Sequence, residues 1–471
     1  MESVNPHQTN FFPLKGLKSP WSAVNATLSS WESSSAEPVR GIAPAGIFEK
    51  SFIISLMVIQ CALLHPKFQG STSARLTRLS LGPLTIGWWL SYPFRLPALP
   101  IQDRSVFPGI MAAIMIFKSL EWTFASGPYH IRSLKIVQGV PVWKKDSTDE
   151  LSLEKRQSGL GDFALWTVLL FTSQRGLRWS WGPESKGNTN SFAQALLELV
   201  RLQMVLLPSL GFVLYSEDWA NYEIDPRGAL LRLGVPSFRG LGFIAGCLHS
   251  VGTMTALSTI VEIPSAIAVL LFHLVYSIAK TMGLSPKLSE LVNPAGLPPY
   301  FGSLFELSSL AHFWGKSWHQ KFRRAFLFCG GKPAISLARA LGASPEVQKV
   351  CGVFAVFAVS GLLHEYPLHA FQREPHPYPR ELFKTLPGTF IFFFAQALGV
   401  ILEPFVIPHV PKKLGGAKLW TASFLLLTAP LFTRDACRPP GLFNQFRPLQ
   451  EWTWVEILIP GPLSSRTIAT K

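Results

Sequence analysis

The sequence has few charged residues, and acidic ones are especially scarce. Only 15% of its 471 residues are charged, and 28 Asp and Glu face 43 Lys and Arg, which gives a net charge of +15. Hydrophobic residues make up 48% of the chain, with 15 Trp and 35 Phe. This composition is typical of membrane proteins and argues against a soluble nucleic-acid-binding protein. The positive charge then points to anionic lipid headgroups or to an anionic substrate.

The sequence also lacks the signatures of several common sites. Its five cysteines occur without CxxC or Cys/His spacing, so we expect neither a disulfide scaffold nor a metal site. GxSxG, Walker A and HExxH patterns are absent, which argues against serine hydrolases, nucleotide hydrolases and zincins. We find no internal repeat and no inverted pair of halves of the kind that many transporters contain.

The first fifty residues differ in composition from the rest of the chain. Residues 1–50 are rich in Ser, Pro and Asn and lack the basic-then-apolar pattern of a cleaved signal peptide. We expect a flexible extramembrane arm, in which Asn25 begins a glycosylation sequence that matters only on a lumenal side. Residues 51–463 are expected to form one polytopic domain, and residues 464–471 a C-terminal tail.

Apolar segments recur from residue 51 onward. Several are shorter than the roughly 20 residues of a perpendicular span, so they must extend, tilt or be re-entrant. Backbone groups in lipid must be hydrogen-bonded internally, and no segment alternates as barrel strands do. We therefore predict an all-α membrane protein with about 8–10 transmembrane helices around an intramembrane tunnel. The segments are residues 52–64, 79–94, 106–125, 163–171, 193–215, 241–261, 263–279, 350–363, 386–402 and 419–432.

Charge in the loops predicts the orientation in the membrane. Residues 316–349 carry seven Lys or Arg and a single acid, Glu346. Basic loops remain on the cytosolic side, so we expect this stretch to face the cytosol.

One histidine follows a long uncharged stretch. In "VFAVFAVSGLLHEYPLH", residues 350–363 carry no charge, His364 and Glu365 follow, and Pro367 is expected to end the helix. At about 1.5 Å per residue, His364 would lie roughly 21 Å into a hydrocarbon core of about 30 Å. A neutral imidazole there suits a general base for an alcohol. A histidine that only hydrogen-bonds a neighbouring helix is the alternative.

A second stretch, "FWGKSWHQKFRR" at residues 313–324, combines aromatic and basic residues. Trp314, Trp318 and Phe322 would share one face of an amphipathic helix at the membrane surface. Such a surface suits a ligand with phosphates at one end and an apolar or thioester end in the bilayer. Headgroup binding beside an aromatic belt is the alternative. The basic residues are Lys316, Lys321, Arg323 and Arg324, and His319 lies among them.

Other polar residues interrupt the apolar segments. Lys118 and Glu121 are three residues apart, so we expect them to pair on one helical face and to hold helices together. The remaining polar residues have no spacing that indicates a particular reaction; they are His249, Glu262, His273 and Glu403.

Together these stretches resemble a known family. "LFELSSLAHFWGKSWHQKFRR" followed by "VSGLLHEY" is similar to the wax-synthase-like branch of the membrane-bound O-acyltransferases, particularly its fungal members that modify secondary metabolites. "RGLRWSWGP" at residues 175–183 and "FFFAQALGVILEPF" at residues 392–405 add to the resemblance. It covers about residues 160–435.

The resemblance implies transfer of an acyl group from acyl-CoA to a hydroxyl inside a membrane tunnel. The family's histidine corresponds to His364, and its Asn-or-His position in the FW stretch corresponds to His319. His364 would act as base and His319 would orient groups or act as an acid or base. Trp314, Lys316, Trp318, Lys321, Arg323 and Arg324 would bind the acyl-CoA, which is a co-substrate and not a bound cofactor.

We therefore predict an endoplasmic-reticulum O-acyltransferase that acetylates a hydrophobic, hydroxylated terpenoid or meroterpenoid. The substrate class rests on the resemblance alone. A long-chain wax-ester or sterol-ester synthase is the alternative enzyme, and a membrane transporter or lipid-binding scaffold is the alternative outside enzymes. The sequence does not indicate the oligomeric state.

Overall fold

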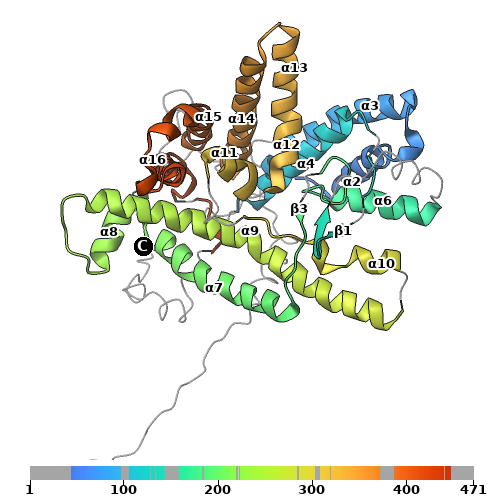
Figure 1. Ribbon diagram of the computed structural model, residues 1–471. Helices are drawn as coiled ribbons and strands as arrows, with labels where there is room; N and C mark the ends of the chain where they lie inside the picture. Colours follow the sequence, from blue (N-terminus) through green and yellow to red (C-terminus); the bar gives the residue numbers. More distant parts are fainter. Residues whose placement is uncertain are drawn as a thin grey trace, which may run out of the picture.

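The computed structural model describes most of the chain and is mostly helical (Figure 1). It describes residues 44–96, 105–127, 129–132, 134–143, 159–182, 185–218, 221, 223–283, 286–302, 308–318, 320–371, 387–439 and 441–446. The proposed tail at residues 464–471, Asn25 and most of the proposed N-terminal arm lie outside these residues. The domain boundaries at residues 50 and 463 stay predictions.

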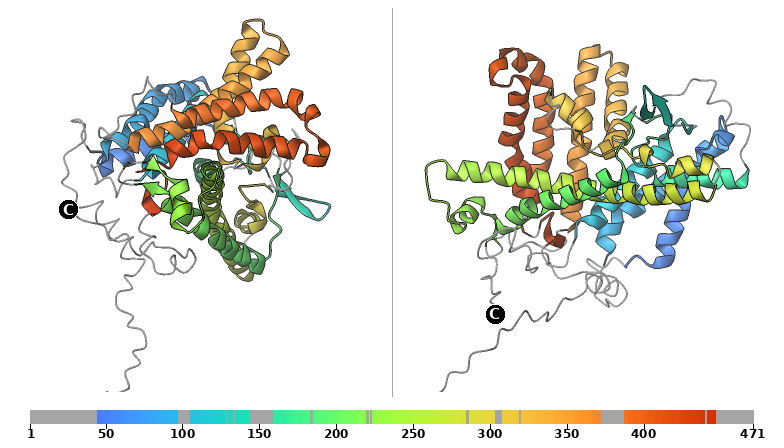
Figure 2. Two further views of the ribbon diagram at one scale, coloured as in Figure 1. Left: turned by 90° about the vertical axis from the view of Figure 1, so that its left-hand side faces the viewer. Right: turned by 60° about the horizontal axis from the view of Figure 1, so that its bottom comes forward.

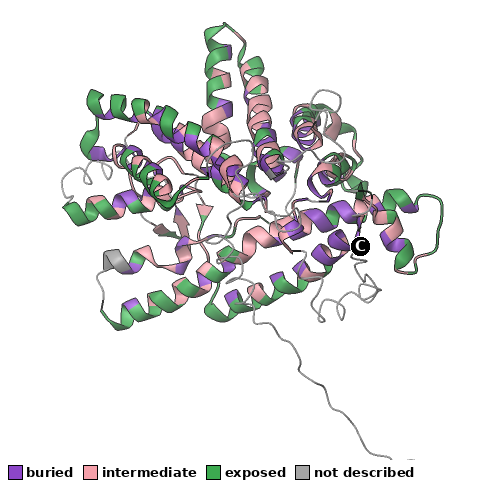
Figure 3. Ribbon diagram, turned by 180° about the vertical axis from the view of Figure 1, so that it is seen from behind, coloured by how far each residue is buried: buried purple, intermediate pink, exposed green. Residues whose placement is uncertain are grey.

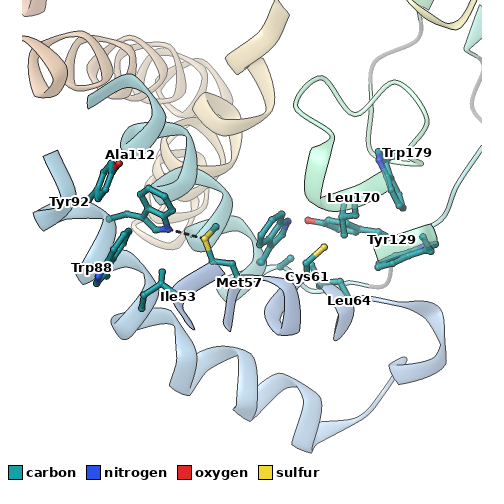
Figure 4. Packing of buried hydrophobic residues seen from close by; sticks show 14 residues of the cluster. Ile53, Met57, Cys61, Leu64, Trp88, Tyr92, Ala112, Tyr129, Leu170 and Trp179 are labelled. Carbon is teal, nitrogen blue, oxygen red and sulfur yellow. Dashed lines mark hydrogen bonds between the residues drawn. The ribbon is translucent and has the colours of Figure 1, made fainter. Parts of the chain in front are cut away.

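Four helices from the first part of the chain pack around a buried aromatic cluster. They are α2 (Ile47–Ala62), α3 (Thr72–Ser91), α4 (Phe107–Phe124) and α6 (Leu160–Thr172), with the 3-10 turns η2 (Pro66–Phe68) and η3 (Tyr92–Arg95). Figure 4 shows Met57 inside this cluster, and the Nε1 of Trp89 donates to the Met57 sulfur at 2.9 Å. Met57 and Cys61 are fully buried, because one face of α2 turns inward.

Two small antiparallel sheets connect the helices. The first contains β1 (Leu134–Val137), β2 (Val140–Trp143) and β3 (Ser185–Lys186), with Leu134 opposite Trp143. Gln138 and Gly139 form its two-residue turn with φ of 50° and 79°, as tight hairpin turns require. The second sheet pairs β4 (Glu217–Asp218) with β5 (Glu223–Ile224).

The middle of the chain forms a long antiparallel helix pair. It consists of α7 (Phe192–Tyr215) and α9 (Leu241–Thr281), accompanied by α8 (Pro226–Arg232), α10 (Pro286–Leu291) and the turn η6 (Pro294–Gly296). The prediction of two separate segments at residues 241–261 and 263–279 was wrong, because α9 continues through Pro264. Its 41 residues give a length of about 62 Å, twice a hydrocarbon core of about 30 Å. Helix α9 is therefore too long to stand upright with all of its residues inside the hydrocarbon core.

The last part of the chain forms a second helical group that α7 and α9 cross at its foot (Figures 1 and 2). It contains α13 (Lys332–Ala340), α14 (Pro345–Phe371), α15 (Gly388–Val406) and α16 (Ala417–Ala436), with the turns η11 (Ile407–His409) and η12 (Lys412–Leu414). Helix α14 packs against α13, α15 and α4, so it is the central helix of the group. Figure 3 shows exposed residues along the outer sides of the helices and buried residues where the helices pack against one another.

Four helices of the described part are long and apolar enough to cross a membrane. They are Phe192–Tyr215, Leu241–Thr281, Pro345–Ala370 and Gly388–His409. The other predicted segments are helical too, but α2 and α6 are short, and α3, α4 and α16 do not reach the same combination of length and apolar composition. The helical, multi-pass class is thus confirmed, whereas the count of about 8–10 spans and the tunnel stay predictions.

Candidate functional site

His364 lies in the last third of α14, and one of its ring nitrogens is hydrogen-bonded. Its Nδ1 is 2.7 Å from the Ser360 carbonyl oxygen, one turn earlier. A carbonyl oxygen only accepts hydrogen bonds, so Nδ1 carries the proton and Nε2 keeps its lone pair. No residue in the described ranges hydrogen-bonds Nε2, and the side chain is half-buried. This is the tautomer that a general base for a hydroxyl needs.

Aromatic rings cover the imidazole. Phe393 of α15 stacks on it with ring centroids 4.5 Å apart, and Phe432 of α16 approaches edge-on at 5.8 Å. Helices α14, α15 and α16 thus meet at His364. A ring environment of this kind disfavours water and is chemically compatible with an apolar substrate.

The residues after His364 hold the helix in place. Glu365 accepts hydrogen bonds from the Thr389 hydroxyl and from the Phe390 amide, at 3.2 Å for the latter, which ties α14 to the start of α15. The prediction that Pro367 ends the helix was wrong, because α14 continues to Phe371. A Cβ on Gly109 of α4 would come within 2.7 Å of the Pro367 Cα, so the backbones of the two helices are in direct contact. Packing against a neighbouring helix is the usual way in which a membrane helix tolerates an internal proline.

Trp314 connects the basic and aromatic stretch to His364. Its Nε1 donates to the Gln396 side-chain oxygen at 3.3 Å, and Gln396 in turn donates to Thr428 at 2.8 Å. The Trp314 ring also contacts Phe393, with centroids 5.7 Å apart, and Phe393 stacks on His364. The structure therefore brings Trp314 and His364 into contact with the same phenylalanine, although they are fifty residues apart in sequence.

The stretch itself is not the continuous amphipathic helix that its spacing predicted. It is broken into α11 (Leu310–His312), the π-turn η8 (Phe313–Ser317), η9 (Gln320–Phe322), α12 (Arg323–Phe326) and the π-turn η10 (Leu327–Gly331). Trp318 has extended backbone with ψ of 133°, and its ring packs on Phe313 at 5.5 Å. Trp314 and Trp318 still face each other at 6.2 Å. His319 lies outside the described residues.

Glu403 anchors the residues that immediately precede this stretch. The two oxygens of its carboxylate accept from the backbone amides of Leu310, at 2.7 Å, and Ala311, at 3.2 Å. The side chain is buried, with 6% of its surface exposed. A carboxylate at exposed amides of a helix start satisfies donors that would otherwise lack partners. Helix α15 thus holds the stretch at two places, through Glu403 and through Gln396.

The four basic residues of the stretch have different surroundings. Arg324 donates to Glu121 at 2.9 Å and to the Tyr129 hydroxyl at 3.0 Å, and its guanidinium lies 4.6 Å from the centre of the Trp181 ring. Burial and the Glu121 charge raise the pKa of Tyr129, so its hydroxyl stays protonated. Lys316 and Arg323 are exposed, and Lys321 is half-buried.

The expected pair of Lys118 with Glu121 does not form. Glu121 pairs with Arg324, and Lys118 donates to the backbone carbonyls of Phe171 and, at 2.9 Å, of Ser173. Those carbonyls belong to the end of α6, where a cation is favourable because helix carbonyls are unpaired there. The partner of Glu121 comes from 203 residues further along the chain, which helical spacing cannot indicate.

Sequence reasoning missed Gln396 and Phe393, and it named Glu403 only as a polar residue in an apolar segment with no particular reaction. Gln396 and Glu403 are seven positions apart in an apolar run, so they lie on one face of α15. That spacing was the available signal, because polar residues inside an apolar helix seldom face lipid.

Comparison with known proteins finds a similarity to one family and to several distant relatives. Residues 297–394, which include Trp314, His364 and Phe393, match the membrane bound O-acyl transferase family. The O-mevalon transferase yanI of Aspergillus niger is 24% identical over 328 residues, which cover 66% of each chain. The acetyltransferase ple2 of Rhodocybe pseudopiperita is 25% identical over 56% of this chain and 62% of its own, and the acetyltransferase aurG of Calcarisporium arbuscula is 32% identical over 33% and 38%.

These relatives are distant, and the chain spans about two thirds of the length of yanI. The matched region nevertheless carries both stretches that the structure brings together at Phe393. Over residues 297–394 the chain is therefore similar to the membrane bound O-acyl transferase family, and its relatives are named as transferases.

Proposed function

We propose that this enzyme transfers an acetyl group from acetyl-CoA to a hydroxyl of a hydrophobic secondary metabolite of the terpenoid or meroterpenoid type. The observation that carries the proposal is the His364 imidazole, whose Nδ1 is held by Ser360 and whose Nε2 is left to accept a proton. The aromatic rings of Phe393 and Phe432 around it suit an apolar acceptor.

The chemistry follows from that tautomer. Nε2 of His364 accepts the proton of the acceptor hydroxyl while the hydroxyl oxygen attacks the thioester carbonyl carbon. The tetrahedral intermediate then collapses, the carbon–sulfur bond breaks, and the imidazolium returns the proton to the leaving thiolate. A thioester is already activated, so no acyl-cysteine intermediate is required. His319 would donate a hydrogen bond to the carbonyl oxygen as it becomes negative, a contribution of about 3 kcal/mol.

The donor would approach along the basic and aromatic stretch. The exposed cations Lys316 and Arg323 would attract the phosphates, with Lys321 closer in, and the pantetheine arm would pass Trp314 and Trp318 in a tunnel towards His364. Arg324 would attract the phosphates less than the other cations, since its charge is compensated by Glu121. The acceptor would enter from the bilayer, which we expect to be that of the endoplasmic reticulum, with the basic stretch on the cytosolic side.

The names of the relatives favour a small acyl group. Two of the relatives above are named acetyltransferases and one an O-mevalon transferase. We therefore place acetyl first and a mevalonyl-type group second. Long-chain acyl groups, as in wax-ester or sterol-ester synthesis, come third.

The test is a donor competition in membranes from cells that express the full chain, with membranes from cells that lack it as the control. Acetyl-CoA and oleoyl-CoA are offered together with hydroxylated terpenoids and fatty alcohols, and esters are identified by mass. Acetylated terpenoid is the expected product. Oleoyl esters alone would overturn the acetyl assignment, and the absence of every ester would favour a transporter or scaffold.

A further inference from the structure

A small pocket lies beside the basic and aromatic stretch, between α4, the end of α6 and residues 321–325. Its volume is about 40 Å³, which is room for a few water molecules or one compact polar group. Its polar and charged lining residues are Lys118, Glu121, Ser173, Gln174, Lys321 and Arg324.

The charges of this pocket do not balance. It is lined by three cations, Lys118, Lys321 and Arg324, and by one carboxylate, Glu121. Glu121 compensates Arg324, since the two lie 2.9 Å apart. The remaining excess is therefore two positive charges, carried by Lys118 and Lys321.

Both lysines keep donor capacity. Lys118 gives two of its three N–H groups to the carbonyls of Phe171 and Ser173, which leaves one. Lys321 makes no hydrogen bond or ion pair with any described residue and only lies 5.9 Å from the centre of the Tyr300 ring. Burial lowers the pKa of Lys321, which reflects the cost of an ammonium that has lost water and gained no acceptor.

A phosphate group matches these features. It carries a charge of about −1.5 to −2 at neutral pH and three strong acceptor oxygens, and lysine is a common ligand for it. We infer that this pocket binds a phosphate group, with Lys118 and Lys321 as its ligands and Glu121 and Arg324 as the pair that fixes the wall between them.

The position of the pocket suggests a long ligand. A Cβ on Gly330, six residues after Arg324, would come within 2.6 Å of the Ala355 carbonyl oxygen, so this segment lies directly on α14. Ala355 precedes His364 by nine residues, or about 14 Å along the helix. A phosphate here and a reacting group at His364 would be joined by an extended arm.

Two sources of the phosphate are chemically equivalent at the pocket. One is the phosphate end of the acyl-CoA donor, and this version rests on the proposed function. The other is the headgroup of an anionic phospholipid. With either source, Lys118 can bind the phosphate because it is not paired with Glu121.

The experiment measures equilibrium binding and not turnover, with the full chain in phosphatidylcholine nanodiscs. Radiolabelled coenzyme A is titrated without acceptor, and phosphatidic acid is titrated separately by native mass spectrometry. The variants are Lys321→Gln, Lys321→Arg and Lys118→Gln, and the matched control is Lys332→Gln at the exposed start of α13. Because Lys118 also holds α6, its variant counts only if the helix content is unchanged.

We expect Lys321→Gln to weaken coenzyme A binding about 10-fold, as loss of one charged hydrogen bond predicts. Lys321→Arg should recover most of the affinity, and Lys332→Gln should not change it. If Lys321→Gln weakens the binding of phosphatidic acid but not that of coenzyme A, the phosphate site is supported and the lipid is its source. Affinities for both ligands that stay within 2-fold in Lys321→Gln would overturn the inference. Lysine-dependent coenzyme A binding by a protein that forms no ester would uphold the site and refute the proposed function.

Discussion

The Nε atom of Arg324 lies 2.9 Å from a carboxylate oxygen of Glu121, and this contact joins segments 203 residues apart. Their side chains are only 16% and 11% exposed, and the Tyr129 hydroxyl completes the group. The pair fixes the basic and aromatic stretch to α4. Its role is therefore to place the stretch, which in turn places Trp314 near Phe393 and His364.

Removing one partner of this pair should destabilise the protein. Arg324→Gln or Glu121→Gln leaves an uncompensated charge in a mostly buried site, at a cost of about 3 to 5 kcal/mol. Thermal unfolding of the detergent-solubilised protein measures the effect. Arg323→Gln, one residue away but exposed, is the control and should change stability by less than about 0.5 kcal/mol. Equal melting temperatures for both arginine variants would mean that the pair contributes nothing.

Glu403→Gln should impair the reaction because Glu403 holds the backbone next to Trp314 in position. The amide keeps one acceptor but places N–H groups near the Leu310 and Ala311 amides, so one charged hydrogen bond is lost. We expect the kcat for ester formation to fall about 10-fold with the KM for the acceptor unchanged. Glu346→Gln, at the exposed start of α14, is the matched control. A purely structural role would instead lower the amount of folded protein and leave the kcat of the folded fraction intact.

Donor affinity should depend on pH through Lys321. Burial lowers the pKa of Lys321, so its ammonium loses the proton at a lower pH than the usual value of about 10.4. The protonated form attracts the phosphate, and therefore the KM for acyl-CoA should rise as pH increases in the range below that value. Lys321→Arg stays charged and should flatten this dependence. A rise of equal size in Lys321→Arg would assign the titration to another group.

Local patterns predicted the helices and the two stretches of the site. Apolar segments became α2, α3, α4, α6, α7, α15 and α16, and an uncharged run led to His364 in the last third of α14. Hydrophobic periodicity carries this information because each segment must bury or expose whole faces.

Predictions from the sequence failed at prolines and at pairs of residues that are far apart in the chain. Pro264 and Pro367 lie inside α9 and α14, where local propensity would end a helix. Pro367 is buried against Gly109 of α4, and such packing lets a helix continue through a proline. Glu121 had a cation three residues away, yet its partner is Arg324. The fold decides between such partners, and a single sequence gives no distance between remote segments. The break at Trp318 likewise depends on its packing against Phe313.

The central claim is that His364 is the base for an acceptor hydroxyl, and a comparison of two histidines on α14 tests it most directly. Ester formation is measured with His364→Ala and with His369→Ala, which removes an exposed histidine from the same helix. Both proteins should insert into the membrane to equal levels. We predict that His364→Ala lowers the rate at least ~100-fold, the scale of a lost general base, and that His369→Ala changes it little. An unchanged rate in His364→Ala would contradict the mechanism.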